Sequence, residues 1–297
     1  MTTSRLVKQR ARAGRAFIAP NLAAVAVFML FPLGFSLYMS FQKWDLFTPP
    51  KFVGFGNFRQ LFTADPLFPI ALRNTVIFTV GTLVPTVVIS LAVAGALNRK
   101  IRSIGVFRTV IFLPLAVSAV VMAVVWQFVF NTNNGLLNTM LGWVGIGPIP
   151  WLTDPKWAMV SLCTVSVWKS VPFATVILLA AMQGVPRILY DAARIDGASG
   201  MRQFFSITVP LIRGALAFVV VMSIINAFQA FDQVYVLTGG HGGPETGTYV
   251  LGIMLFQNAF AFLDFGYASA LAWVMFAILL GLTALQLRLT RRNIVEY

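Results

Sequence analysis

The feature that most constrains this sequence is a series of long apolar runs. Each is close to the roughly 20 residues that cross a hydrocarbon layer about 30 Å thick. Only 10% of the 297 residues are charged and 58% are hydrophobic, so the chain lacks the polar cover that a water-soluble domain needs. The sequence therefore predicts an all-α polytopic membrane protein with six transmembrane helices. The predicted spans are residues 16–42, Asn74–Leu97, Thr109–Phe130, Trp157–Met182, Gly214–Phe231 and Phe265–Leu287.

Two apolar segments have a competing interpretation. The first run follows a basic tail, as a cleavable signal peptide would, but it exceeds the roughly 7–15 apolar residues of such a peptide. The uncharged stretch Thr246–Leu263 could be a seventh span, yet it would put the two termini on opposite sides of the membrane. We therefore expect six spans. Pro32, Pro85, Pro114 and Pro172 fall within them and are expected to kink their helices.

The basic residues predict the orientation. Sixteen of the 22 Lys and Arg residues fall in segments that six spans place on one side. The positive-inside rule then puts both termini in the cytoplasm. The net charge of +13 is explained by this layout and by anionic lipid headgroups, so no nucleic-acid partner is expected. The basic residues on that side are Arg5, Lys8, Arg10, Arg12, Arg15, Arg99, Lys100, Arg102, Arg108, Arg187, Arg194, Arg202, Arg213, Arg288, Arg291 and Arg292.

The domain organisation expected from these spans is simple. Residues 1–16 and 288–297 form basic cytoplasmic tails, and residues 17–287 form one six-span domain with a cytoplasmic loop at 183–213. A single cysteine, Cys163, excludes an intramolecular disulfide. A single histidine, His241, leaves too few soft ligands for a usual zinc site.

Loop 183–213 contains a short helix with clear start and stop signals. Pro186 suits a first helical turn and Gly197 a left-handed cap, and the eleven residues from Pro186 to Asp196 would be about 16 Å long. Ile188, Ala192 and Ile195 recur at helical spacing, so this helix is predicted to be amphipathic. It is either a docking element for another protein or a loop helix lying on the inner headgroups. A second element, Gly200–Val209, is expected to end at Pro210.

The spacing within this loop resembles the EAA loop of permease subunits in binding-protein-dependent ABC importers. Asp191-Ala192-Ala193 is followed by three residues, Gly197, nine residues and Ile207-Thr208-Val209-Pro210, with Asp for the family's Glu and Val for its Leu. The resemblance covers nearly the whole chain, is greatest to the first permease of maltose and glycerol-3-phosphate uptake systems, and implies the type I ABC importer permease fold. Supporting segments are Phe112–Pro114, Gly135–Asn138, Val167–Lys169, Leu189–Ala198, Phe265–Leu271 and Thr238–Pro244. The segment Thr238–Pro244 corresponds to the family's TGGGP loop and is longer than it by two residues.

The resemblance also implies partners and a membrane. They are a second homologous permease, two ATPase subunits and an extracytoplasmic solute-binding protein, in the cytoplasmic membrane of a prokaryote. The chain has no G-x-x-x-x-G-K-[ST] loop, so ATP and Mg are expected in the ATPase, no cofactor in this chain, and no enzyme activity of its own. The residues implied to couple to the ATPase are Tyr190, Asp191, Ala192, Ala193, Ile195, Asp196 and Gly197.

Polar residues within the predicted spans are candidates for the solute pathway. Asn226, Gln229 and Asp232 recur every three residues at the outer half of the fifth span, where they either bind solute or bond to other helices. Lys169 is either a solute contact or a lysine satisfied by backbone, and Trp126 and Gln127 are weaker candidates. The solute is expected to be a carbohydrate or glycerol-phosphate-type compound. The alternative, an ion-coupled carrier or channel without an ATPase, would need intramembrane carboxylates, whereas the nine acids lie in loops or at span ends.

Overall fold

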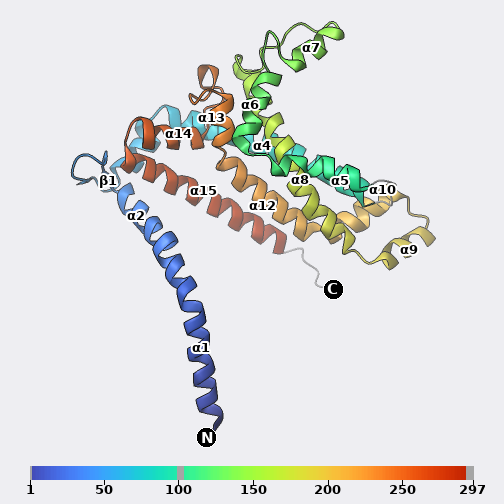
Figure 1. The fold of residues 1–297 in the computed structure, drawn as a ribbon, viewed down its shortest axis with the longest axis horizontal. Coiled ribbons are helices and arrows are strands. Elements are labelled where there is room, and N and C mark those ends of the chain that lie inside the picture. The colour runs from blue at the N-terminus through green and yellow to red at the C-terminus, as the bar shows by residue number, and fades with distance from the viewer. Residues whose placement is uncertain (1, 99–103, 292–297) are drawn as a thin grey trace. The chain divides into compact units, whose positions relative to one another are not determined.

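The structure is a computed structural model that describes residues 2–98 and 104–291, with side chains for residues 13–98 and 105–289. It confirms an all-α membrane fold (Figure 1). Four helices of the described chain are long and apolar enough to cross a membrane, and two bent helix pairs bring the number of spans to six if each pair is one span. The four continuous spans are Ala13–Ser40, Leu67–Leu97, Pro155–Gln183 and Phe265–Leu289.

The third and fifth spans are broken. Gly105–Ala116 and Ala119–Val129 meet at 103°, and Val117 between them is extended, just after Pro114, which confirms the expected kink there. Gly200–Leu211 and Arg213–Phe228 meet at 71°. The second helix of loop 183–213 does not end at Pro210 as predicted, because the proline occupies a first-turn position of the next short helix, where its missing N–H costs nothing.

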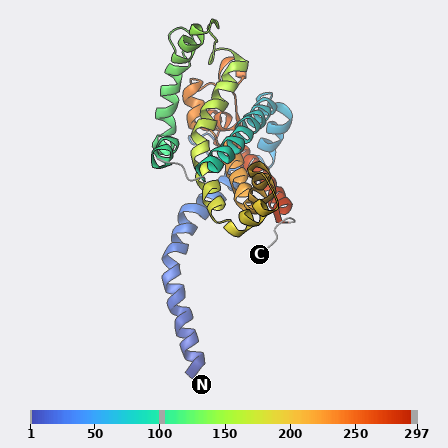
Figure 2. The same ribbon diagram turned by 90° about the vertical axis from the view of Figure 1, so that its right-hand side faces the viewer.

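The elements follow one another as in Figures 1 and 2, with four π-helical turns and two 3₁₀ turns between the α-helices. Pro85 and Pro172 lie inside long helices without ending them. The helices and strands are α1 Thr2–Val25, α2 Phe31–Ser40, β1 Gln42–Lys43, β2 Lys51–Phe52, α3 Gly56–Arg59, α4 Leu67–Leu97, α5 Ile104–Phe112, α6 Ala119–Val129, α7 Leu136–Trp143, α8 Pro155–Gln183, α9 Arg187–Ile195, α10 Gly200–Gln203, α11 Val209–Leu211, α12 Arg213–Phe228, α13 Asp232–Leu237, α14 Leu251–Phe256 and α15 Phe265–Arg291. The π turns are Ala26–Leu30, Gln60–Ala64, Phe204–Thr208 and Gln257–Ala261, and the 3₁₀ turns are Leu113–Ala116 and Pro244–Thr246.

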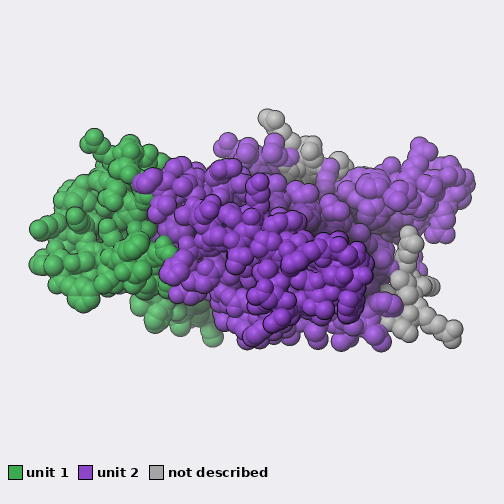
Figure 3. All heavy atoms as spheres, turned by 90° about the horizontal axis from the view of Figure 1, so that it is seen from above, with its two compact units in different colours: residues 1–65, 255–274 green, residues 66–254, 275–297 purple. Residues whose placement is uncertain are grey.

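The chain forms two compact units, coloured separately in Figure 3. One consists of residues 1–65 and 255–274, and the other of residues 66–254 and 275–297. The second unit is built on the packing of α4 along α8, with α12 against α4. A stripe of small hydroxyl residues on α4 is buried at helical spacing, and three of these hydroxyls, those of Thr75, Thr79 and Thr82, donate to carbonyls of their own helix, which lets a neighbouring helix approach closely while these three groups stay paired. The stripe is Thr75, Thr79, Thr82, Thr86 and Ser90.

One sequence expectation is settled by element length. Thr246–Leu263 contains only the short apolar helix Leu251–Ala261, so it is not a seventh span. The basic residues used to orient the chain are described only in part. Arg99, Lys100, Arg102 and Arg292 lie outside the described residues, and the side chains of Arg5, Lys8, Arg10, Arg12 and Arg291 lie outside the described side chains.

Candidate functional site

The helix predicted in loop 183–213 is α9, and local signals define both of its ends. Pro186 is the residue before its first turn, and Gly197 follows its last turn with φ +76°. The Ala198 N–H donates to the Ala193 carbonyl (2.9 Å) and the Gly197 N–H to the Arg194 carbonyl (3.1 Å). This double hydrogen bond is a Schellman cap, which needs a left-handed residue and therefore favours glycine.

One face of α9 is apolar and unpacked in the isolated chain. Ile188 is 74% exposed and Ile195 88% exposed, with the exposed Ala192 between them. Asp191 and Arg194 are also exposed and form an ion pair of 3.0 Å. Such an exposed pair contributes little to stability in water. The residues predicted for ATPase coupling are therefore mostly presented outward, including Asp196 and Gly197 at the end of the helix.

The other face of α9 is tied to the membrane helices. The Tyr190 hydroxyl hydrogen-bonds the buried Thr208 hydroxyl at 2.8 Å, and Ala193 is half-buried. Tyr190 also packs on a hydrophobic cluster that includes Leu178 and Ile212. These two residues thus hold α9 in place rather than form its outer surface, a division that helical spacing alone did not predict.

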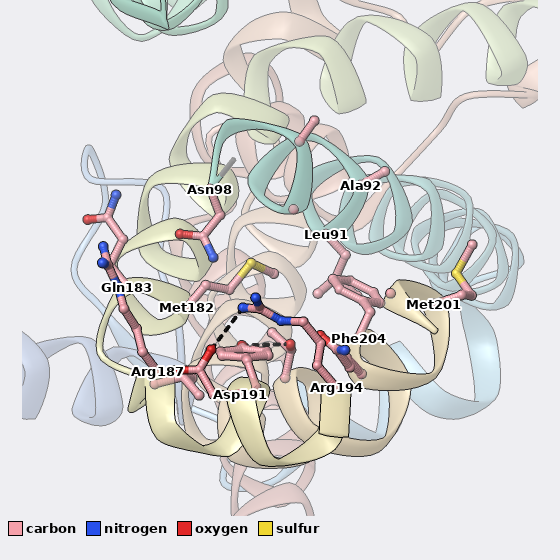
Figure 4. A pocket seen from close by; sticks show the side chains of 17 residues that line it. Leu91, Ala92, Asn98, Met182, Gln183, Arg187, Asp191, Arg194, Met201 and Phe204 are labelled. Atoms are coloured by element: carbon pink, nitrogen blue, oxygen red, sulfur yellow. Dashed lines mark hydrogen bonds and ion pairs between the residues drawn. The ribbon is translucent and has the colours of Figure 1, made fainter. Parts of the chain in front are cut away.

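A cavity of about 970 Å³ lies between α9 and the ends of α4 and α8. In Figure 4 the paired Asp191 and Arg194 lie on its α9 side, and Leu91 and Ala92 of α4 lie opposite. The Gln203 side chain donates to the Ala198 carbonyl at 2.9 Å, so α10 is fixed to the end of α9. The loop therefore borders an open cavity, and two hydrogen bonds, Tyr190–Thr208 and Gln203–Ala198, hold its helices in place.

A second cavity, of about 370 Å³, lies among the membrane helices α4, α6, α8, α12 and α13. Asn226, Gln229 and Asp232 all line it, together with Lys169. They do not lie on one helix face as predicted, because α12 ends at Phe228 and α13 begins at Asp232. The break itself brings the three side chains to the cavity.

Lys169 has a backbone partner at this cavity. Its Nζ donates to the Val117 carbonyl at 3.0 Å. Val117 lies in the break of the third span, where the helix cannot supply an intrahelical donor. Both interpretations of Lys169 therefore remain: it braces the broken span, and it also lines the cavity.

The cavity contains polar groups that the sequence analysis missed. The Gln233 amide donates to the Ser166 hydroxyl at 2.8 Å, linking α13 to α8. Thr86 is only 1% exposed, yet its hydroxyl has no hydrogen-bond partner in the described structure. Periodicity on single helices could have found the α4 stripe, but not which of its members meet α8 and α13. The missed polar lining residues are Thr82, Thr86, Ser166, Ser170, Ser223 and Gln233.

Trp126 and Gln127 are not among the residues that line this cavity. Gln127 donates a short hydrogen bond to the Val236 carbonyl and so joins α6 to α13. The Trp126 ring packs edge-to-face on Trp168, with ring centroids 5.9 Å apart. Both side chains stabilise contacts between elements that border the cavity.

Comparison with known sequences identifies the family. The profile of the family described as the binding-protein-dependent transport system inner membrane component matches residues 86–295. The chain belongs to this family. Its members are transport permeases, so the chain is a permease subunit of an ABC importer and not an enzyme. An ion-coupled carrier or channel is not favoured.

Relatives confirm the resemblance seen in the sequence. The trehalose/maltose transport system permease protein MalF of Thermococcus litoralis is 34% identical, and the alignment covers 97% of each chain. The sn-glycerol-3-phosphate transport system permease protein UgpA of Pectobacterium atrosepticum is 33% identical over 99% of each chain. A chain in the crystal structure of a bacterial alginate ABC transporter, in complex with an alginate pentasaccharide-bound periplasmic protein, has a TM-score of 0.82 at 22% identity and 96% coverage of each chain. The last similarity confirms the type I permease fold.

Proposed function

We propose that this chain forms half of the translocation pathway for a carbohydrate or glycerol-phosphate-type solute, driven by a cytoplasmic ATPase that grips α9. The observation that carries the proposal is the exposed apolar face of α9, Ile188, Ala192 and Ile195, on a helix whose opposite face is fixed by Tyr190. An isolated helix of nine residues is unstable in water, so its stability comes from these ties. The unpacked face is then free for a partner.

The assembly proposed gives this chain four kinds of partner. Two ATPase subunits, which bind ATP and Mg, dock on the loops of this chain and of a second homologous permease. An extracytoplasmic solute-binding protein delivers the solute, and lipid of a prokaryotic cytoplasmic membrane covers the remaining apolar surface. The basic residues predicted for one side support an orientation with both termini in the cytoplasm. The alginate transporter was solved in complex with a periplasmic protein that carries an alginate pentasaccharide, which supports a delivery step of the same kind here.

The geometry gives a route from α9 to the membrane cavity. The Thr208 hydroxyl that holds Tyr190 lies just before the 71° bend at Ile212, and α12 continues from that bend to Asn226 at the cavity. A displacement of α9 therefore turns α12 about the bend and changes the distance between the polar groups of the cavity. This is the kind of rigid-body rocking that alternates access to a midplane site.

The cavity chemistry supports a solute rich in hydroxyl groups. Its volume of about 370 Å³ lies at the small end of the range for ligand pockets, roughly 300–1,000 Å³. Amides of Asn226 and Gln229 both donate and accept hydrogen bonds, as hydroxyl groups do. The rings of Phe173 and Phe231 also line the cavity and offer apolar faces to a sugar ring. Lys169 supplies a positive charge that a phosphate group would need.

The experiment that tests the proposal is uptake into proteoliposomes with and without the ATPase. The two permeases are reconstituted with loaded binding protein outside and ATP inside. We expect accumulation only when the ATPase is present, and its loss when Asp191→Lys removes the Arg194 ion pair and places a cation on the docking surface. Accumulation without the ATPase, or unchanged uptake by the Asp191→Lys variant, would contradict the coupling role.

A further inference from the structure

A small hairpin follows the first span directly. The span ends at Ser40, and β1 begins at Gln42 and pairs antiparallel with β2, so that Gln42 lies opposite Phe52 and Lys43 opposite Lys51. An isolated two-stranded hairpin is marginally stable in water. Here it persists because the ends of two spans hold it.

Hydrogen bonds fix the hairpin at the level where those spans end. The buried Asn57 amide donates to the carbonyls of Ser40 (2.9 Å) and Gln42 (2.8 Å). The N–H of Phe265, the first residue of α15, donates to the Trp44 carbonyl at 3.0 Å. At Gly266 a Cβ atom would lie 1.9 Å from the Gln42 carbonyl oxygen, so only glycine allows this approach. The base of the hairpin is thus held at the membrane boundary from both sides.

Three phenylalanines of the hairpin point outward. Phe47 is 80%, Phe52 75% and Phe55 72% exposed. The turn that carries Phe47 is ordered, since the Asp45 carboxylate accepts the N–H groups of Phe47 (3.0 Å) and Thr48 (2.8 Å). Several large apolar side chains exposed on one hairpin are typical of a binding surface.

The two lysines supply a second, independent signal. Lys43 and Lys51 are directly opposite and both exposed. Like charges in this arrangement destabilise a strand pair. Neither forms an ion pair within the part of the chain that the structure describes. An anionic surface beside the hairpin would offset the repulsion.

We propose that this hairpin, residues 41–55, anchors the chain in the lipid interface of the leaflet opposite the N-terminal tail, which is the outer leaflet in the orientation proposed above. Phe47, Phe52 and Phe55 insert at headgroup level, and Lys43 and Lys51 reach lipid phosphates. Lipid fits better than a soluble protein because the hairpin base is fixed where two spans leave the bilayer, and because aromatic rings with flanking lysines are the usual anchors of that zone.

The first test places an environment-sensitive fluorophore on Phe47→Cys in a Cys163→Ser background, with the permease complex in nanodiscs. Phe52→Cys serves as a second site in case one variant misfolds, and His241→Cys, exposed in the glycine loop, is the water-facing control. We expect lipids spin-labelled at the headgroup to quench most emission at positions 47 and 52, and aqueous iodide to quench little. The control should show the opposite order. Quenching by iodide alone at positions 47 and 52, or protection that appears only when the solute-binding protein is added, would overturn the proposal.

The second test separates lipid binding from a structural role of the lysines. The Lys43→Gln/Lys51→Gln double variant is melted in nanodiscs with and without phosphatidylglycerol, and in detergent. We expect phosphatidylglycerol to raise the melting temperature of the parent protein and to lose most of that effect in the variant. In detergent the variant should melt no lower than the parent, because a like-charge repulsion has been removed. An equal phosphatidylglycerol effect in both proteins would contradict the lysine contact with phosphate.

Discussion

Loop 183–213 and the membrane cavity are built in opposite ways. The loop is specified by neighbouring residues: Pro186 before α9, Gly197 after it, and a Tyr190–Thr208 bond between residues 18 positions apart. The cavity is lined by elements from α4 to α13, and three of its polar groups meet there because α12 ends at Phe228 and α13 begins at Asp232. The outward face of α9 can therefore be changed without altering the membrane helices, whereas cavity residues such as Lys169 and Gln233 also join separate elements. This difference predicts where substitutions will separate coupling, solute transfer and stability.

The largest effect is expected on the exposed face of α9. Ala192→Arg places an unpaired charge in the proposed ATPase contact, which costs about 3 kcal/mol, or about a hundredfold in affinity. The measurement is binding of purified ATPase to the permease pair in nanodiscs. Ala64→Arg, at an exposed position outside the loop, is the matched control and should bind normally. Normal ATPase affinity of the Ala192→Arg variant would contradict the role of the exposed α9 face in ATPase binding.

A smaller effect is expected in the cavity. Asn226→Ala and Gln229→Ala each remove amide hydrogen bonds to solute. The loss of such bonds costs about 1.4 kcal/mol of solute binding, which corresponds to about a tenfold change. We expect uptake at saturating loaded binding protein to fall about tenfold, with ATPase affinity unchanged. Gln127→Ala is the control, since it breaks the bond to Val236 outside the cavity and should lower stability more than transport. Normal uptake by both cavity variants would show that solute passes elsewhere.

Substitutions of Lys169 test whether a cavity residue also stabilises the break in the third span. Lys169→Met leaves the Val117 carbonyl without its donor, a loss of about 1–3 kcal/mol. We expect a lower melting temperature, by about 2–4 °C for each kcal/mol in a chain of this size. Lys169→Arg keeps a donor and should recover most of the stability. If Lys169→Met melts normally but transports poorly, Lys169 serves the solute and not the break.

Two glycines in the loop test whether α9 is ended by the residue that follows it in the sequence. Gly197→Ala forces an alanine into φ +76° and should cost about 1 kcal/mol, although the added Cβ meets no atom within 4 Å. Gly200 begins a helix in equally open space, so Gly200→Ala should be neutral or stabilising by a few tenths of a kcal/mol. Hydrogen exchange at the Ala198 amide measures both. Equal exchange in the two variants would contradict the Schellman cap as the element that ends α9.

The smallest effect concerns a local turn outside both regions. Hydrogen bonds from Thr48 lower the pKa of Asp45. A lowered pKa means that the turn is stabilised above the ordinary carboxyl pKa, near 4, and that this stabilisation is lost as pH falls through the lowered pKa. Amide shifts of Phe47 and Thr48 should report the loss below pH 4. Asp45→Asn should show no such transition, and an unchanged transition in it would assign the titration to another group.

The sequence predicted the loop better than the cavity. Helix α9, its cap at Gly197 and the kink at Pro114 depend on residues close in the chain, and all three were predicted. The cavity was predicted from a repeat on one helix that the structure breaks at Phe228. The Lys169–Val117 bond, over 52 positions, and the Gln233–Ser166 bond, over 67, leave no pattern in a single sequence. Long-range pairing was therefore the part that required the structure.

The most direct test of the account is a crosslink from the outer face of α9. Ile195→Cys in a Cys163→Ser background is reconstituted with the second permease, a cysteine-scanned ATPase and loaded binding protein. We predict a disulfide between position 195 and the ATPase that stops ATP-driven uptake and is reversed by reduction. Labelling of position 195 by an impermeant maleimide from outside intact cells, or full uptake with the crosslink formed, would contradict α9 as the lever.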